Sequence, residues 1–209
     1  MDKMCKKIHL LIISMNNYER KIQKKKRREE ISEYLNNQHI VQVGYICGPK
    51  SYKYIKFSIE TLIKSVSSTE RIEILIGNNC KDCDFSVFNE FKHKFYSFKV
   101  YDVHSNLKHP SRNHGEALNT LLWKYFNRKY GMVVDSDVAF LKKNWDIEYI
   151  KLMNLSDKIV IAGCGNSLHA KYKFNNFPSV YCPFFKTEKL KECGLTWEPW
   201  IYDVKNKKY

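Results

Sequence analysis

The sequence lacks a long hydrophobic run and is poor in glycine and proline. The longest uninterrupted apolar stretch near the N-terminus is Leu10 to Ile13, far short of the roughly 18 to 20 residues of a transmembrane helix. With 8 glycines and 5 prolines in 209 residues, fibrous and low-complexity compositions are excluded. No small-residue cleavage site follows the basic start, so we expect no signal peptide and a cytoplasmic protein.

Cysteine is present seven times, an odd number, without the spacing of a disulfide-stapled scaffold. We therefore expect reduced thiols. Cys80 and Cys83 form a lone CxxC pair, and no second pair stands at zinc-ribbon spacing. An ordinary loop with two cysteines is the prediction here, and no zinc site.

Positive charge is in excess, with 36 Lys and Arg against 22 Asp and Glu and a formal net charge of +14. A field of this sign favours anionic partners, but the excess is spread along the chain. The one dense run, Lys24 to Arg28, continues into Glu29 and is typical of a solvated helix face. Nucleic acid is therefore not expected as a partner. Residues 20–36 remain a candidate contact for a membrane surface, which would make the protein peripheral to it, or for a partner subunit.

Short β-type runs alternate with helical patterns, which predicts an α/β domain with a largely parallel sheet. The predicted strands are 40–47, 71–76, 97–103, 131–134 and 159–163, and the predicted helices are 55–66, 113–127 and 188–193. Asn113 stands three residues before Glu116, as in a capping box that starts a helix. Residues 1–38 are expected to be a basic N-terminal extension, a strand plus a polar helix, to a domain that spans 39–209.

Asp135-Ser136-Asp137 directly follows an apolar strand. In an extended conformation the two carboxylates would point to the same side and could hold Mg²⁺ or Mn²⁺ beside a diphosphate. The alternative is an acidic turn that ends the strand. Ligands of open α/β sheets bind at the carboxyl ends of the strands, so Asn78 and Asn79 would face the same crevice if their strand is parallel to this one.

The stretch from Val41 to Trp145 resembles the nucleotide-sugar-binding half of family 2 glycosyltransferases, which have the GT-A fold. The matching segments, in order, are VGYICGPKSYKYIKFSIETLIKSV, EILIGNN, NHGEALNTLLW and MVVDSDVAF. The resemblance implies a single domain with an open, mostly parallel twisted sheet flanked by helices. Residues 39–145 would be its nucleotide-sugar-binding half and residues 146–209 its acceptor half. It further implies a metal-dependent, inverting transfer of a sugar from a nucleoside-diphosphate sugar to a hydroxyl acceptor such as a glycan, a glycolipid or a protein.

Carried onto this sequence, the resemblance assigns Asp135 and Asp137 to Mn²⁺ or Mg²⁺ and the donor diphosphate, with His169 as a candidate third metal ligand. Asn78 stands where the family usually has an aspartate facing the base, which leaves the base open. The residues assigned to the nucleotide sugar are Gly48, Pro49, Asn78, Asn79, Arg112, Asn113, Gly115, Asp135, Ser136 and Asp137.

Inverting transfer also needs a carboxylate that takes the proton of the acceptor hydroxyl. Residues 194–203 resemble the acidic segment that supplies this base in the family. Glu198 is the first candidate and Asp203 the second.

Three alternatives stand beside this hypothesis. A sugar nucleotidyltransferase would share the fold class and the carboxylates, but it needs a glycine-rich phosphate loop after the first strand, which Gly44, Gly48 and Pro49 do not make. The others are a catalytically inactive GT-A-like binding module and a basic nucleic-acid-binding module.

Overall fold

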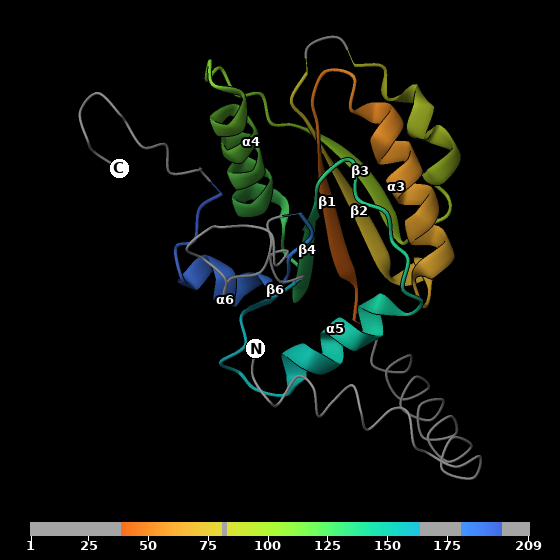
Figure 1. Cartoon of the computed structure of the whole chain (residues 1–209), viewed down its shortest axis with the longest axis vertical. Coiled ribbons are helices and arrows are strands. Elements are labelled where there is room, and N and C mark those ends of the chain that lie inside the picture. Colours follow the sequence, from red (N-terminus) through yellow and green to blue (C-terminus); the bar gives the residue numbers. More distant parts are fainter. Residues whose placement is uncertain (1–38, 81–82, 164–180, 198–209) are drawn as a thin grey trace, which may run out of the picture. The chain divides into compact units, whose positions relative to one another are not determined.

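The computed structural model describes residues 39–80, 83–163 and 181–197, in which helices flank a six-stranded sheet (Figure 1). The strand order across the sheet is β3-β2-β1-β4-β6-β5. The strands are β1 Val41–Cys47, β2 Ile72–Asn78, β3 Ser97–Asp102, β4 Tyr130–Val134, β5 Ile161–Ala162 and β6 Phe184–Lys186. The helices are α3 Tyr52–Ser65, α4 Pro110–Tyr125, α5 Trp145–Asn154 and α6 Thr187–Glu192, with 3-10 helices η1 Thr69–Arg71 and η2 Phe85–Phe91.

Four strands run in the same direction. β1 pairs in parallel with β2 and β4, and β2 pairs in parallel with β3, so that Val43 lies opposite both Ile74 and Met132. β6 is antiparallel to β4 and to β5. Every residue of β1 is buried, as expected for a strand covered on both faces. The prediction of a mostly parallel α/β sheet is confirmed, and β2 and β4 are parallel as the predicted crevice requires.

The alternation of side chains along β1 shows which helices cover which face. The hydroxyl of Tyr45 lies 3.1 Å from Oγ of Ser58 in α3. The next side chain, Ile46, points the other way and joins a core cluster with Leu121 of α4 and Leu190 of α6. Helices α3 and α4 therefore lie on opposite faces of the sheet (Figure 1).

β6 repeats this alternation. Phe184 stacks on Tyr149 of α5, with ring centroids 5.1 Å apart, whereas Phe185 packs against Phe126 at 5.6 Å on the α4 face. Gly131 of β4 leaves the room for this second pair, because a Cβ there would lie 2.4 Å from a ring carbon of Phe185. Helix α5 thus covers the same face as α3.

A buried polar network closes the amino end of the sheet. Gln42 accepts hydrogen bonds from the backbone N–H groups of Asn127 (2.7 Å) and Arg128 (2.9 Å), and its Nε2 donates to Glu73 (3.1 Å). Glu73 also accepts from Lys99 (2.8 Å) and from Arg128 (3.2 Å). Burial alone would raise the pKa of Glu73, but these two cations outweigh it and hold the pKa below its usual value. The network ties the connection between α4 and β4 to the first two strands.

Helix α4 starts earlier than predicted. It begins at Pro110, with His109 as its N-cap and no side-chain cap. Proline suits the first helical position because its φ is preset and it has no N–H to satisfy. The prediction that Asn113 caps this helix is therefore wrong. The predicted strand 159–163 is also shorter, since only Ile161–Ala162 pair as β5.

Helix α5 and strand β6 are absent from the sequence prediction. α5 buries Asp146, whose carboxylate accepts hydrogen bonds from the backbone N–H of Ser67 (3.0 Å) and from its hydroxyl. Burial raises the pKa of Asp146, and the bonds from Ser67 oppose that shift. A buried carboxylate interrupts the apolar pattern by which a helix is predicted, and β6, with 3 residues, is too short for a detectable alternation.

The predicted extension at residues 1–38 lies outside the described residues. Among the helices of the described ranges, none combines the length and apolar character that a bilayer span requires.

Candidate functional site

The carboxyl ends of the four parallel strands lie along one edge of the sheet. Two backbone hydrogen bonds fix the chain as it leaves this edge, from Asn79 to the carbonyl of Cys47 (2.9 Å) and from Val103 to the carbonyl of Asn78 (2.9 Å). Asp135 follows the end of β4 directly. The sequence-predicted residues after β1, β2 and β4 therefore share this edge, with β1 in the middle.

Asn79 and Asn113 are bonded to each other across the edge. Nδ2 of Asn79 donates to Oδ1 of Asn113 at 2.6 Å, and Oδ1 of Asn79 accepts from the backbone N–H of Ser105 at 3.0 Å. Nδ2 of Asn113 donates to the carbonyls of Ser105 (2.8 Å) and Leu107 (3.2 Å). The two amides therefore fix the loop between β3 and α4 against the end of β2.

Asn78 faces the neighbouring strand. Its Nδ2 donates to Oδ1 of Asp102 at 2.8 Å, and its Oδ1 accepts from the backbone N–H of Cys80 at 3.0 Å. Asp102 is the last residue of β3 and is exposed. A carboxylate is thus present at this edge after all, one strand away from the position at which the resemblance expects it.

Asp135 to Val138 form a turn. The carbonyl of Asp135 accepts from the backbone N–H of Val138 at 3.1 Å, and the N–H of Asp135 donates to the carbonyl of Tyr181 at 2.8 Å. The expectation of an extended Asp-Ser-Asp segment is therefore wrong, because the bond from Val138 to Asp135 closes a turn directly after β4. Nε2 of His114 lies 3.6 Å from Oδ1 of Asp135.

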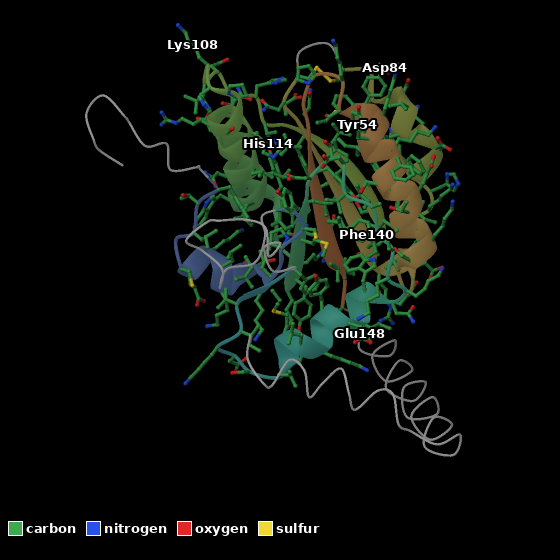
Figure 2. The ribbon with its side chains drawn as sticks, viewed as in Figure 1. Tyr54, Asp84, Lys108, His114, Phe140 and Glu148 are labelled. Atoms are coloured by element: carbon green, nitrogen blue, oxygen red, sulfur yellow. A yellow bond between two sulfur atoms is a disulfide. The ribbon has the colours of Figure 1, made fainter. Side chains whose placement is uncertain are left out.

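The other predicted residues of α4 differ in exposure. Arg112 is exposed in the first turn, where a ligand at the strand edge could reach it, whereas Gly115 is buried. Figure 2 shows His114 on α4 and Asp84 beyond β2, on either side of the strand ends. The prediction that Gly115 contacts the nucleotide stays untested, and its burial indicates a packing position.

A pocket of about 680 Å³ opens beside the ends of β1 and β2. Its lining residues are Pro49, Lys50, Tyr52, Asn79, Cys80, Cys83, Asp84 and Val87. Lys50 has a φ of 68°, a left-handed conformation that is uncommon for a residue other than glycine and concentrates at functional sites. Gly48 adjoins this loop, and the Ser51 hydroxyl donates to its carbonyl at 2.9 Å.

Cys80 and Cys83 in the wall of this pocket are joined by a disulfide. The expectation of reduced thiols is wrong for this pair, because the loop brings their Cα atoms within 5.8 Å, a separation that a disulfide spans. The prediction that this pair is no zinc site rests on the absence of a second pair at zinc-ribbon spacing, and it stays a prediction.

The remaining predicted site residues are His169, Glu198 and Asp203, and all three lie outside the described residues. Within the ranges described, no group of three or more His, Cys, Asp or Glu side chains is placed to hold a metal ion. The structure thus brings together the predicted residues of β1, β2, α4 and β4, and it leaves the predicted base and third ligand untested.

Three residues at this edge were missed by the sequence reasoning: Asp102, His114 and Lys50. Asp102 could have been found, because it ends a predicted parallel strand just as Asn78 does. His114 and Lys50 carry no local signal, since the approach of His114 to Asp135 and the backbone angle of Lys50 depend on tertiary contacts.

No protein-family model and no curated protein matches the sequence. Solved structures do. The mannosyltransferase PcManGT from Pyrobaculum calidifontis, in complex with GDP-Man and Mn²⁺, is 13% identical with a TM-score of 0.57. S. aureus TarS 1-349 in complex with UDP is 17% identical with a TM-score of 0.55. The galactosyltransferase LgtC in complex with donor and acceptor sugar analogs is 11% identical with a TM-score of 0.54.

The alignments cover 74%, 75% and 72% of this chain and 46%, 49% and 59% of those chains, respectively. This chain therefore spans about half the length of these structures. At such low identities the similarity is one of fold. The described chain has the GT-A fold of these nucleotide-sugar glycosyltransferases, as the sequence resemblance predicted.

Proposed function

We propose that the chain is a metal-dependent glycosyltransferase that transfers a sugar, with inversion, from a nucleoside-diphosphate sugar to a hydroxyl acceptor. The arrangement at the strand edge carries this proposal. A pocket that Asn79 helps to line stands at the end of β2, and the carboxylates of Asp135 and Asp137 stand at the end of β4. The donor complexes of the similar structures, with GDP-Man and with UDP, support it.

The pocket beside Asn79 is where we place the nucleoside. Tyr52 offers a ring face for the base, and Lys50 and Asp84 offer polar groups for the base or ribose. The diphosphate would extend toward the first turn of α4, where the helix end carries partial positive charge. Arg112 is exposed there, and its fixed fork of donors suits phosphate oxygens.

Asp135 and Asp137 are the residues that would hold Mn²⁺ or Mg²⁺. Both are hard oxygen donors, Asp135 half-buried and Asp137 exposed, and a site that takes only two carboxylates from the protein suits these ions when water and phosphate oxygens complete the shell. The donor set therefore fits. A bound ion would supply neutralisation of the charge that develops on the departing nucleoside diphosphate.

Removal of the acceptor proton is assigned to Glu198, with Asp203 as the second candidate. A carboxylate in this role must reach the acceptor hydroxyl on the side of the sugar away from the diphosphate. The assignment rests on the sequence resemblance of residues 194–203, as does that of His169 to the metal.

Calorimetric titration tests the donor site. UDP, GDP, CDP, dTDP and ADP are titrated with Mn²⁺, Mg²⁺ or EDTA into the wild type and into the Asp135→Ala/Asp137→Ala variant. We expect one diphosphate to bind only with metal and the double variant to lose that binding. Asp157→Ala is the matched control, because it removes an exposed carboxylate outside the strand edge.

Binding that ignores both metal and the double substitution would contradict the proposal, as would the absence of binding. Turnover is then followed as release of the nucleoside diphosphate from GDP-mannose and UDP-GlcNAc in the presence of hydroxyl acceptors. Donor binding without turnover under any acceptor would identify the alternative, a GT-A-like binding module. If Glu198→Gln abolishes turnover but not binding, the assignment of the base is supported.

A further inference from the structure

Large apolar side chains are exposed together on the α3 and α5 face of the sheet. Tyr54 and Phe57 of α3 are 60% and 55% exposed, Leu141 in the loop before α5 is 89% exposed, and Leu152 of α5 is 39% exposed. Single exposed apolar residues are ordinary, but a larger apolar patch marks an interaction site, and Leu141 and Leu152 also line one pocket. We call these four residues, together with the pocket that Leu141 and Leu152 line, the apolar face.

The loop and α3 are joined by hydrogen bonds, so this face is continuous. The backbone N–H of Phe140 donates to Oγ1 of Thr61 at 3.0 Å, and the N–H of Asn144 donates to the carbonyl of Ser65 at 2.7 Å. Thr61 follows Phe57 by four residues and Tyr54 by seven, which places all three on one stripe of the helix. Leu141 therefore extends the aromatic stripe of α3.

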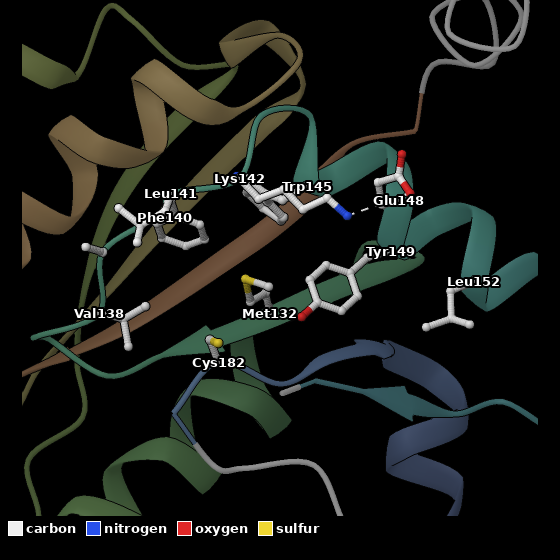
Figure 3. Close-up of a pocket in the computed structure, with 11 residues that line it drawn as sticks. Met132, Val138, Phe140, Leu141, Lys142, Trp145, Glu148, Tyr149, Leu152 and Cys182 are labelled. Atoms are coloured by element: carbon white, nitrogen blue, oxygen red, sulfur yellow. Dashed lines mark ion pairs between the residues drawn. The ribbon is translucent and has the colours of Figure 1, made fainter. Parts of the chain in front are cut away.

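A pocket of about 500 Å³ lies between this loop and α5 (Figure 3). Its walls are mostly apolar: they include Met132, Val138, Phe140, Leu141, Trp145 and Leu152. An ion pair of Lys142 with Glu148, at 3.9 Å, stands at its edge. The pocket thus suits a hydrocarbon segment.

Lysines surround the apolar face. Lys53 and Lys64 of α3 and Lys142 and Lys143 of the loop are exposed. The nearby acidic side chains are Glu60, which is half-buried, Asp137, which is exposed next to Val138, and Glu148, which is paired with Lys142, so that the lysines remain in excess. A second copy of this chain packed on the same face would bring lysines against lysines, whereas an anionic lipid surface complements both the charge and the apolar side chains.

We propose that the apolar face binds a phospholipid membrane with anionic headgroups. Phe57 and Leu141 enter the acyl region, the lysines contact the headgroups, and the pocket beside Trp145 receives part of an acyl chain. This surface is distinct from the sequence-predicted contact at residues 20–36. The membrane proposal does not depend on the proposed transfer reaction, because it is tested by membrane binding and not by turnover.

Cosedimentation of the full chain with vesicles tests the proposal. We expect binding to vesicles of phosphatidylcholine with roughly 30% phosphatidylglycerol and little binding to phosphatidylcholine alone. Phe57→Ser with Leu141→Ser should lower the partition coefficient by at least about tenfold, because two apolar side chains no longer leave water. Lys142→Glu with Lys143→Glu should lower it as well. Trp123→Ser is the control, since Trp123 is 43% exposed on α4, on the opposite face.

Three outcomes would overturn the proposal. The first is no binding to either vesicle. The second is binding that survives the substitutions in the apolar face but is lost with Lys24→Glu, Lys25→Glu and Lys26→Glu, which would assign the membrane contact to the N-terminal run. The third is a wild-type dimer that Leu141→Ser turns into a monomer, which would assign the face to a second copy. Thermal unfolding of each variant shows whether it is folded. Leu141→Ser is also tested alone, because a substitution at this exposed position should not disturb the core.

Discussion

Nδ2 of Asn79 donates a 2.6 Å hydrogen bond to Oδ1 of Asn113 and thereby joins the end of β2 to the first turn of α4. The same two amides hold the loop between β3 and α4 through Ser105 and Leu107. Because this loop and the pocket beside Asn79 share one edge, the geometry of the proposed donor site depends on a bond between two side chains rather than on the sheet alone.

Asn113→Ala should therefore weaken donor binding. It removes the acceptor for Asn79 and the donor for two carbonyls, and we expect a loss of about 1–3 kcal/mol in unfolding free energy and at least about a tenfold rise in Kd for the diphosphate that binds. Titration calorimetry and urea unfolding measure the two effects. Asn106→Ala, at an exposed position in the same loop, should change neither, and an equal effect of both substitutions would refute the special role of Asn113.

Asn78→Asp should destabilise the fold at pH 7. In the wild type, Oδ1 of Asp102 accepts a hydrogen bond from Asn78 at 2.8 Å. The substitution replaces this donor with a second carboxylate, and two close carboxylates raise the pKa of one of them. The folded state then favours the protonated form, so stability is retained at low pH and lost as pH rises through the raised pKa. We expect a Tm about 2–4 °C lower at pH 7 and little change at pH 4.

Asp102→Asn combined with Asn78→Asp completes that test. The exchange restores one amide and one carboxylate at the two positions, so thermal unfolding should return to the wild-type Tm. A double variant no more stable than Asn78→Asp would show that the pair does not interact.

Glu73→Gln should remove a pH-dependent part of the stability. The lowered pKa of Glu73 in the folded state means that its contribution is present above the unfolded value of about 4.3 and is lost as pH falls through the folded value. We expect the variant to be about 1–3 kcal/mol less stable at pH 7, because Lys99 and Arg128 lose a charged partner. The loss is limited because both cations are partly exposed to water.

Urea unfolding from pH 7 to pH 3 measures this difference, which should shrink toward zero at the acid end. Glu70→Gln is the control, since Glu70 is exposed in η1. A constant difference between wild type and Glu73→Gln at all pH values would contradict the assignment to charge.

Gly131→Ala should destabilise the sheet by about 1–3 kcal/mol through overpacking. Its Cβ would lie 2.4 Å from a ring carbon of Phe185 and 2.7 Å from one of Phe126, and both rings are buried. Gly48→Ala is the matched control, because a Cβ there meets nothing within 4 Å. Urea unfolding of the two variants compares them, and equal stabilities would show that the core around Phe126 can adjust.

The order of strands and helices up to β4 was predictable from the sequence, because each element carries its own pattern. The β-branched and aromatic residues of β1 and the helical stripe of α3 are patterns of residues within a few positions of each other. Since parallel strands place their carboxyl ends together, the positions of Asn78, Asn79 and Asp135 at one edge followed from the same patterns. Helix α5 and strand β6 were not predictable in this way. The buried Asp146, which bonds to Ser67, interrupts the apolar pattern of α5, and β6 is recognised only by its pairing.

The sequence by itself thus determined the parallel α/β core and the edge that carries the candidate site. Tertiary structure decided the conformation of the site. The N–H of Asp135 bonds to Tyr181 at the end of β4, Asn113 bonds to Asn79 rather than capping α4, and Asp102 supplies the carboxylate beside Asn78. Each of these contacts joins residues far apart in the chain, whose distance in space is fixed by the packing of the sheet and not by any pattern of neighbouring residues.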